Sequence, residues 1–416
     1  MDFLDTMMRR NPALIRAAFE LYSRGQIHQD TYVLDLDAVR LNSVSVSRAA
    51  EQAGLKTYFE PKQFGRNPLA CREVVRSGME EAIAIDMEEA KSLHRQSVKV
   101  GHVGHLGQVP SNETDYVVGT VSPEVITVYN ADKAAQISKA AKKAGKEQKL
   151  LLKVIGDADL AYYTLGGGVA ERELVSVARK VRSLPNVSVA GVTTYPSMRY
   201  NLKTQRVEPT PNFETLVRCA AELRDAGFEV EQVNAAGLSS TSTMRLLAEN
   251  GGTHAEPGQA LIGMTPLHAF SDEPEIPGML YITEVDHVVG ARAFAYASGF
   301  VANVTTGVWN PLTYEYLYAL AGSSPAELMR QRVILEPPVL PGSDPTFFMY
   351  LALRRTPGTK LKVGQTVIAA TRGQVYRANS VKVAVIDGVQ KGKPRLKGVF
   401  DRNGIRLRGP DDAPAE

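Results

Sequence analysis

The sequence predicts an α/β protein, with a (β/α)8 TIM barrel followed by a C-terminal antiparallel β domain. Between residues 56 and 263, short apolar runs alternate with amphipathic helical stretches. That alternation is typical of repeated βα units on a parallel sheet. From about residue 275 the sequence becomes β-branched and aromatic, with turn residues and almost no helical spacing. Such a composition is typical of antiparallel strands.

The individual elements follow from the hydrophobic periodicity. Residues 1–25 alternate charged and apolar residues at helical spacing, which predicts an amphipathic helix docked on the fold. The run "TYVLDLD" (31–37) is predicted as a strand that precedes the barrel and pairs with the β domain. Barrel strands are expected at 56–61, 81–86, 98–104, 116–121 with 125–130, 149–155, 187–195, 228–235 and 253–263.

These strands and the helical stretches between them form about eight βα units in roughly 220 residues, the size of a (β/α)8 barrel. We therefore expect three regions. Residues 1–44 form a helix and strand associated with the β domain, residues 45–270 form the barrel, and residues 271–416 form the β domain. Only "SPAELMRQRV" suggests a helix in the last region.

The composition excludes several classes of protein. The net charge of +3 comes from 48 basic and 45 acidic residues spread along the chain, so no basic patch for nucleic acid is expected. No apolar run is long enough to span a membrane, and the N-terminus has no signal-peptide core. Cys71 and Cys219 are far apart in helical segments, which favours free thiols in a reducing, cytoplasmic compartment.

Polar residues follow the predicted strands, and in a (β/α)8 barrel the chemistry lies at these C-terminal strand ends. Lys62 directly follows the run "YFEP", which is apolar apart from Glu60. Desolvation there favours the neutral amine that a Schiff-base lysine needs, whereas an ion pair with a neighbouring carboxylate is the alternative. The other polar residues at strand ends are Arg66, His102, His105, Lys153, Tyr195, Asn234, Ser239, Ser240 and Glu256.

Four motifs occur in order at these strand ends: "PKQFGRNP", "GHVGHLGQVP", "VNAAGLSSTS" and "EPGQALIGMTPLHA". With them the sequence resembles the alanine-racemase-type (fold type III) family of pyridoxal 5′-phosphate (PLP) enzymes, over about residues 30–390. It is most similar to the YhfX-type subgroup. The resemblance implies a PLP-binding barrel and a C-terminal β domain.

The resemblance also implies which residues bind the cofactor. Lys62 would form the Schiff base, and Arg66 would face the phosphate. Hydroxyl and backbone N–H groups near the phosphate would come from the two strand-end loops, although plain turn chemistry is the alternative for these residues. The residues expected there are Asn234, Gly237, Ser239, Ser240, Gly258 and Gln259.

Glu256 departs from the alanine racemases, which carry an arginine at the matching position. A carboxylate favours a protonated pyridine nitrogen and so makes the cofactor ring a strong electron sink. A surface glutamate is the alternative, but Glu256 lies within an otherwise apolar run. We therefore expect Glu256 to face the cofactor.

Other aromatic residues and histidines receive weaker assignments. Tyr195 matches the residue that stacks on the cofactor, with a core aromatic as the alternative. His102 and His105 lie three apart, but no third ligand is evident, so proton handling or substrate contact by His105 is expected and no metal site is. Tyr162 is expected to contact substrate or to be an ordinary loop aromatic.

The resemblance narrows the reaction. The metal-dependent relatives carry a C-terminal His and Cys pair, whereas here no His follows His287 and no Cys follows Cys219. The barrel-type decarboxylases place a Cys and an Asp over the site, and this chain offers only Asp344 as a substrate contact. A racemase needs two groups on opposite faces of the substrate, and Lys62 would be one.

Tyr296 from the β domain of a second subunit would be the other, although a strand tyrosine that packs outward is equally consistent with the sequence. The resulting prediction is a PLP-dependent amino-acid racemase or epimerase that forms a head-to-tail homodimer with shared active sites. The alternatives are an amino-acid decarboxylase or lyase, a non-catalytic PLP-binding protein, and an unrelated barrel that uses Lys62 on a sugar carbonyl.

Overall fold

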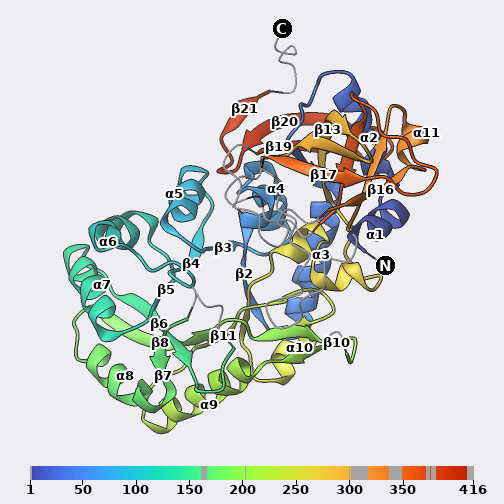
Figure 1. Cartoon of the computed structure of the whole chain (residues 1–416). Helices are drawn as coiled ribbons and strands as arrows, with labels where there is room; N and C mark the ends of the chain where they lie inside the picture. Colours follow the sequence, from blue (N-terminus) through green and yellow to red (C-terminus); the bar gives the residue numbers. More distant parts are fainter. Residues whose placement is uncertain are drawn as a thin grey trace. The chain divides into compact units, whose positions relative to one another are not determined.

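In a computed structural model, the chain folds into two compact units (Figure 1). Unit 1 comprises Met1–Ser43, Lys62–Glu73 and Gln259–Glu416, and unit 2 comprises Val44–Pro61 and Val74–Gly258. No helix in the described part of the chain combines the length and apolarity needed to cross a membrane. The structure describes residues 2–160, 166–201, 203–298, 300, 317–336, 349–371, 375 and 381–409.

Unit 2 contains a closed parallel barrel. Its sheet closes because β5 pairs with β6 and β12 pairs with β2. This confirms the predicted (β/α)8 barrel, and Figure 1 shows the later helices of the unit on the outer side of the strands. Among the described residues, the barrel strands are β2 (Lys56–Phe59), β3 (Glu81–Ala84), β4 (Val100–Val103), β5 (Val125–Val128), β6 (Gln148–Ile155), β8 (Val187–Thr194), β11 (Gln232–Ala235) and β12 (His254–Ala255).

The helices of unit 2 begin at residues that cap them. Asp86 caps α5 by accepting from the Glu89 amide at 2.8 Å, and Asn130 caps α7 by accepting from the Lys133 amide at 2.8 Å. Acidic residues in the first turn and basic residues in the last turn of both helices complement the helix dipole. The principal helices are α5 (Met87–Arg95), α7 (Ala131–Lys143), α8 (Leu174–Arg182), α9 (Pro211–Asp225) and α10 (Met244–Glu249).

Two predicted strands differ from the structure. Residues 116–121 were predicted as a strand but belong to a helical segment, α6 (Thr114–Tyr116) and η3 (Val117–Val121). Thr114, Val117 and Val118 are the buried residues there, and their spacing is that of one helix face, which outweighs the β-branched composition. In the predicted strand 253–263 only His254–Ala255 is extended, and η5 (Gln259–Ile262) follows.

A glycine sets the approach of two barrel strands. Gly191 in β8 has φ +154, and a Cβ built on it would lie 1.9 Å from the carbonyl oxygen of Gln232 in β11. Since that neighbour is backbone, no side-chain movement relieves the contact. Beyond β8, β9 (Met198–Asn201) and β10 (Arg206–Pro209) form a separate two-stranded hairpin.

Unit 1 contains the antiparallel β domain that the sequence predicts. β13 pairs with both β14 and β18, so six strands close into a ring, and β1, β19, β20 and β21 extend the sheet from β13. Among the described pairings, all are antiparallel except that of β1 with β19. The strands are β1 (Thr31–Asp35), β13 (Met279–Val289), β14 (Arg292–Tyr296), β15 (Leu317–Gly322), β16 (Arg332–Leu335), β17 (Tyr350–Arg354), β18 (Thr366–Ala369), β19 (Lys382–Asp387), β20 (Arg395–Asp401) and β21 (Arg406–Arg408).

The N-terminal segment forms two helices instead of the one predicted, α1 (Phe3–Arg10) and α2 (Pro12–Ser23). Asn11 ends α1 and caps α2, since its side chain accepts from the Leu14 amide at 3.3 Å. Pro12 has no N–H to continue α1 but suits the first position of α2. The Asn11 amide also donates to Asp35 at 3.0 Å, which ties α2 to the end of β1.

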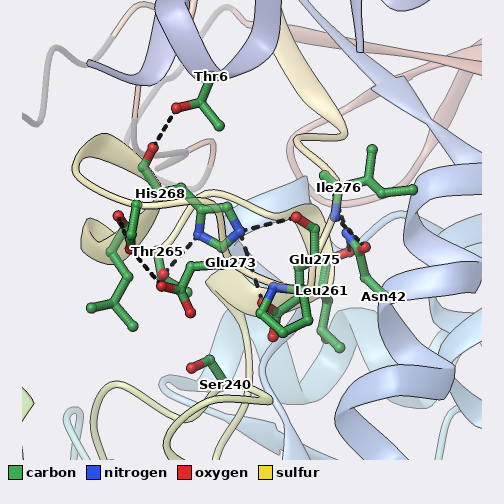
Figure 2. Close-up of polar contacts among 12 residues, drawn as sticks. Thr6, Asn42, Ser240, Leu261, Thr265, His268, Glu273, Glu275 and Ile276 are labelled. Atoms are coloured by element: carbon green, nitrogen blue, oxygen red, sulfur yellow. Dashed lines mark hydrogen bonds and ion pairs between the residues drawn. The ribbon is translucent and has the colours of Figure 1, made fainter. Parts of the chain in front are cut away.

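Buried hydrogen bonds join Thr6 and Asn42 to residues 265–276 within unit 1 (Figure 2). The ring of His268 lies between Thr265 and Glu275, with Nδ1 2.8 Å from the Thr265 hydroxyl and Nε2 3.3 Å from the Glu275 carbonyl. Thr6 donates to the carbonyl of His268 at 2.7 Å, and Asn42 donates to the carbonyl of Ile276 at 2.8 Å. Burial lowers the pKa of His268 to about 4.

Candidate active site

Glu256 lies directly after β12, at the C-terminal end of the barrel in unit 2, and its side chain is only 6% exposed. Its Oε1 atom lies 2.8 Å from Nδ1 of His102 in β4 and accepts from the Asn234 amide in β11 at 2.9 Å. The backbone N–H of Glu256 donates to the hydroxyl of Ser239 at 3.1 Å. Residues of three barrel segments therefore hold one buried carboxylate.

His102 has both ring nitrogens engaged. While Nδ1 faces Glu256, Nε2 lies 2.6 Å from the hydroxyl of Thr127 in β5. The imidazole is completely buried. Since two polar partners on opposite sides of the ring define its orientation, His102 is fixed in the barrel interior.

His105, two residues after β4, lies beside the same carboxylate. Its Nδ1 atom is 3.4 Å from Oε2 of Glu256, which is an ion-pair distance, yet neither ring nitrogen has a hydrogen-bond partner among the described residues. Its ring also contacts Tyr195 edge to face, with centroids 6.2 Å apart. A buried imidazole without hydrogen bonds is costly, so His105 marks a position where a bound group would supply the missing partner.

The surroundings of Glu256 and His105 shift the pKa values of both groups. Burial alone would raise the pKa of Glu256, but the two imidazoles beside it outweigh burial and hold the pKa of that carboxyl below its ordinary value. Burial lowers the pKa of His105, against the pull of Glu256. At neutral pH the site therefore presents an anionic carboxylate and a neutral imidazole.

Lys153 and Tyr129 form a second polar pair. Lys153 near the end of β6 donates to the Tyr129 hydroxyl at 3.1 Å, and that hydroxyl donates to the carbonyl of His105 at 2.6 Å. Burial lowers the pKa of Lys153 to about 8. Thr127 and Tyr129 were not among the predicted site residues. Thr127 lies in β5 and Tyr129 follows the strand directly, two residues on, which is the spacing of side chains on one face of a strand.

The loop after β11 has the features of an anion-binding turn. Gly237 has φ +128, and a Cβ built on it would lie 3.3 Å from the Ser197 amide nitrogen. Ser239 and Ser240 are buried, and the Ser240 amide donates to the Thr243 hydroxyl at 2.8 Å. Close backbone approach at a glycine and small hydroxyl side chains suit a phosphate-bearing group. With the unpartnered His105, these residues fit the cofactor that the sequence predicts.

Unit 1 carries the other predicted cofactor residues. Lys62 lies in η1 (Pro61–Phe64), three residues after the end of β2, and it is 7% exposed. Arg66 has φ +50 and donates to the side chain of Asn403 at 3.1 Å, so its predicted phosphate contact stays a prediction. The side-chain nitrogen of Gln259, at the start of η5, has no hydrogen-bond partner among the described residues.

Tyr296, the predicted second base, ends β14 in unit 1. Its ring packs edge to face on Tyr350, with centroids 5.9 Å apart, and it lines a cavity of about 800 Å³ together with Tyr22 and Glu284. The tyrosine therefore faces a cavity of the β domain and is not a core residue. Tyr162 and Asp344 lie outside the described residues.

The family follows from two comparisons. The family described as "Alanine racemase, N-terminal domain" matches residues 34–266. The uncharacterized protein YhfX of Escherichia coli (strain K12) is 32% identical over 407 residues, which cover 97% of this chain and 99% of that protein. The chain belongs to the alanine racemase family. This confirms the resemblance drawn from the strand-end motifs.

Several solved structures share the fold. Alanine racemase of Clostridium difficile 630, in complex with cycloserine, is 14% identical with a TM-score of 0.60, covering 89% of this chain and 98% of that one. D-threonine aldolase of Filomicrobium marinum is 14% identical with a TM-score of 0.63, covering 91% and 96%. D-threo-3-hydroxyaspartate dehydratase of Delftia sp. HT23 is 13% identical with a TM-score of 0.63, covering 89% and 97%. The fold thus supports racemase, aldolase and dehydratase reactions in different proteins.

Proposed function

We propose that this chain is a PLP-dependent amino-acid racemase or epimerase. The observation that best supports PLP as the cofactor is the buried carboxylate of Glu256, which His102 and Asn234 orient at the C-terminal end of the barrel. An anionic acceptor at that place favours a protonated ring nitrogen on a bound cofactor. Membership of the alanine racemase family supports the same cofactor.

When bound, PLP supplies an electron-withdrawing ring that stabilises negative charge at the Cα atom of an amino acid. Glu256 would accept a hydrogen bond from the ring nitrogen and so hold a proton there. Lys62 would hold the cofactor covalently and move the Cα proton on one face of the substrate. The ring of Tyr195 would stack on the cofactor. The groups that would contact the phosphate belong to Arg66, Gly237, Ser239, Ser240, Gly258 and Gln259.

Racemisation also needs a proton-transfer group on the opposite face, and we assign this role to Tyr296 from a second copy of the chain. Its place beside a cavity of the β domain supports the assignment, because a tyrosine that lines open space is accessible to a bound molecule. The protein would then act as a homodimer with shared active sites. Its substrate would be an amino acid.

A PLP-dependent lyase or decarboxylase is the second candidate. The observation that favours it is the buried imidazole of His105, whose ring nitrogens make no hydrogen bond among the described residues and whose pKa is lowered by burial. A lyase needs a proton donor or acceptor beyond the two groups at Cα, and His105 could fill that role, whereas Lys62 and Tyr296 would suffice for a racemase.

The first experiment tests the cofactor. Purified protein is incubated with PLP, and its visible absorbance is recorded before and after borohydride reduction. We expect a cofactor band that reduction fixes to the chain in the wild type and that is absent in Lys62→Ala. Lys56→Ala, an exposed lysine at the start of β2, is the matched control and should behave as the wild type. A wild type that takes up no PLP would rule out the proposed function.

The second experiment tests the reaction. Amino acids are incubated with the loaded protein in D2O, and loss of the Cα proton signal is followed by NMR together with the optical rotation. A racemase exchanges the Cα proton and interconverts the enantiomers, a decarboxylase releases CO2, and a lyase releases a keto acid or aldehyde. A loaded protein that does none of these across the amino acids would be a cofactor carrier.

A further inference from the structure

His102, His105 and Glu256 bring three groups that bind transition metals to one point inside unit 2. One ligand atom from each residue lies within 4.8 Å of the other two. Two imidazoles and one carboxylate are a common ligand set for Zn²⁺ and similar divalent ions. The sequence offers only the two histidines as candidates, and the third ligand comes from a strand end far along the chain.

The two distances from the imidazoles to the carboxylate are close to those around a bound ion. Metal bonds of about 2.0–2.1 Å in a tetrahedral site separate the ligand atoms by roughly 3.3 Å. In unit 2, Nδ1 of His102 lies 2.8 Å from Oε1 of Glu256, and Nδ1 of His105 lies 3.4 Å from Oε2. Small side-chain rotations would therefore suffice to seat an ion among the three.

The surrounding residues provide the supporting contacts that metal ligands need. A metal-ligating histidine usually donates its second ring N–H to an oxygen, which fixes the ring. Nε2 of His102 lies 2.6 Å from the Thr127 hydroxyl, and Asn234 donates to the carboxylate of Glu256 at 2.9 Å. His102 and Glu256 are thus oriented from outside the triad.

The state of His105 supports a bound ion independently of the ligand spacing. This residue is 1% exposed, and both of its ring nitrogens lack a hydrogen-bond partner among the described residues. A ring nitrogen that makes no hydrogen bond within the described part of the chain, 3.4 Å from a carboxylate oxygen, would gain a metal bond when an ion binds.

We infer that the cofactor-free protein binds one Zn²⁺-like divalent ion at His102, His105 and Glu256, and that this ion and PLP exclude each other. The metal site depends on the triad alone. The exclusion rests on the proposed function, because the same Glu256 carboxylate would have to face the cofactor ring. Metal supply would then control how much of the protein is loaded with cofactor.

The test is a titration of cofactor-free, full-length protein with Co²⁺, read by its visible ligand-field absorbance and by calorimetry for the stoichiometry. We expect one ion per chain. His105→Gln and Glu256→Gln should each weaken binding more than tenfold, and Thr127→Val should weaken it about 10–100-fold by releasing the second nitrogen of His102. His94→Gln, an exposed histidine on α5, is the control and should change nothing.

Absence of Co²⁺ binding by the wild type would overturn the inference, as would binding that both triad variants retain. Thr127→Val keeps all three ligands, so it tests the site even where a triad variant does not fold. Protein with PLP fixed by borohydride should bind no Co²⁺, and undiminished binding there would overturn the exclusion alone. A protein that takes up no PLP defeats the proposed function, while the Co²⁺ titration still decides the metal site.

Discussion

The Nδ1 atom of His102 lies 2.8 Å from Oε1 of Glu256, and Nε2 of the same ring lies 2.6 Å from the Thr127 hydroxyl. The carboxylate is held from the side of β4, and Asn234 holds it from β11. A negative charge is thereby kept inside the barrel, where an unpaired carboxylate would be costly. The first prediction concerns this charge.

Glu256→Gln should weaken PLP binding at least tenfold, about 1.4 kcal/mol, because a neutral amide replaces a charge-assisted hydrogen bond to the ring nitrogen. The measurement is an absorbance titration of cofactor-free protein with PLP. Glu249→Gln on α10, which removes only an exposed ion pair with Arg245, is the control. Equal affinity in wild type and Glu256→Gln would contradict the cofactor role of Glu256.

Lys153→Met should stabilise the protein below pH 8. The pKa of Lys153 is lowered by burial to about 8 from 10.5, so between these values the unfolded chain binds more protons and wild-type stability rises with pH. The methionine removes the cost of burying the charged amine, about 1–3 kcal/mol at pH 7. The gain should shrink toward pH 10.5.

Urea unfolding at pH 7 and at higher pH measures this gain. Lys139→Met, an exposed lysine on α7, is the control and should show no dependence of its effect on pH. A Lys153→Met protein that is less stable than the wild type at pH 7 would show that the contact with Tyr129 outweighs the burial of the amine.

His268→Gln should remove part of the acid sensitivity of unit 1. The pKa of His268 is lowered by burial to about 4 from 6.5, so the unfolded chain takes up the proton first and wild-type stability falls as pH falls through this window. The loss reaches up to about 3 kcal/mol at pH 4. Glu273 and the carbonyl of Glu275 raise the pKa of this histidine and Arg10 lowers it, but burial is the largest effect.

The difference in stability between wild type and variant separates the titration of the His268 imidazole from that of other groups. Thermal unfolding of both proteins is therefore compared from pH 7 to pH 4. The free energy of unfolding of the wild type should fall more steeply with decreasing pH than that of His268→Gln, so any advantage of the wild type at pH 7 should shrink toward pH 4. A difference that stays constant across the range would mean that His268 does not titrate between the folded and unfolded states. His94→Gln on α5 serves as the control.

Tyr296→Phe should reduce racemisation about 10²–10⁴-fold while the cofactor absorbance stays unchanged. The phenylalanine keeps the ring packing on Tyr350 and removes only the hydroxyl. Tyr350→Phe is the matched control, because its ring contacts Tyr296 but its hydroxyl has no assigned role. Kinetics of Cα proton exchange in D2O decide between them, and equal rates in both variants would leave Tyr296 without a catalytic role.

Most of the fold could be predicted from the sequence because each βα unit carries its own periodicity. An apolar run such as "KLLLKVI" reports a strand buried on both faces, and that signal needs only local spacing. The prediction of a strand at 116–121 was wrong because it, too, rested on local sequence alone. Its β-branched residues favour a strand, but Thr114, Val117 and Val118 are buried at helical spacing, which only the packing of the segment decides.

Part of the candidate site could also be predicted from the sequence. Strand-end motifs identify Lys62, Asn234, Ser239 and Glu256 as candidates, since the C-terminal ends of parallel strands carry the chemistry of a barrel. They do not predict the role of Thr127, in β5, or of Tyr129, directly after it, because this segment carries no recognisable motif. Nor do they predict that Arg66 contacts Asn403, a residue that lies 337 positions away in the chain.

The sequence by itself determined the order of βα units, the change to an antiparallel β domain and the family, because these depend on local spacing and short motifs. Only the tertiary structure decided that His102, His105 and Glu256 share one buried point, although His102 and Glu256 are 154 residues apart. The physical reason is barrel closure. Pairing of β12 with β2 and of β5 with β6 brings distant strand ends together, and that register is a property of the closed sheet and of no single segment.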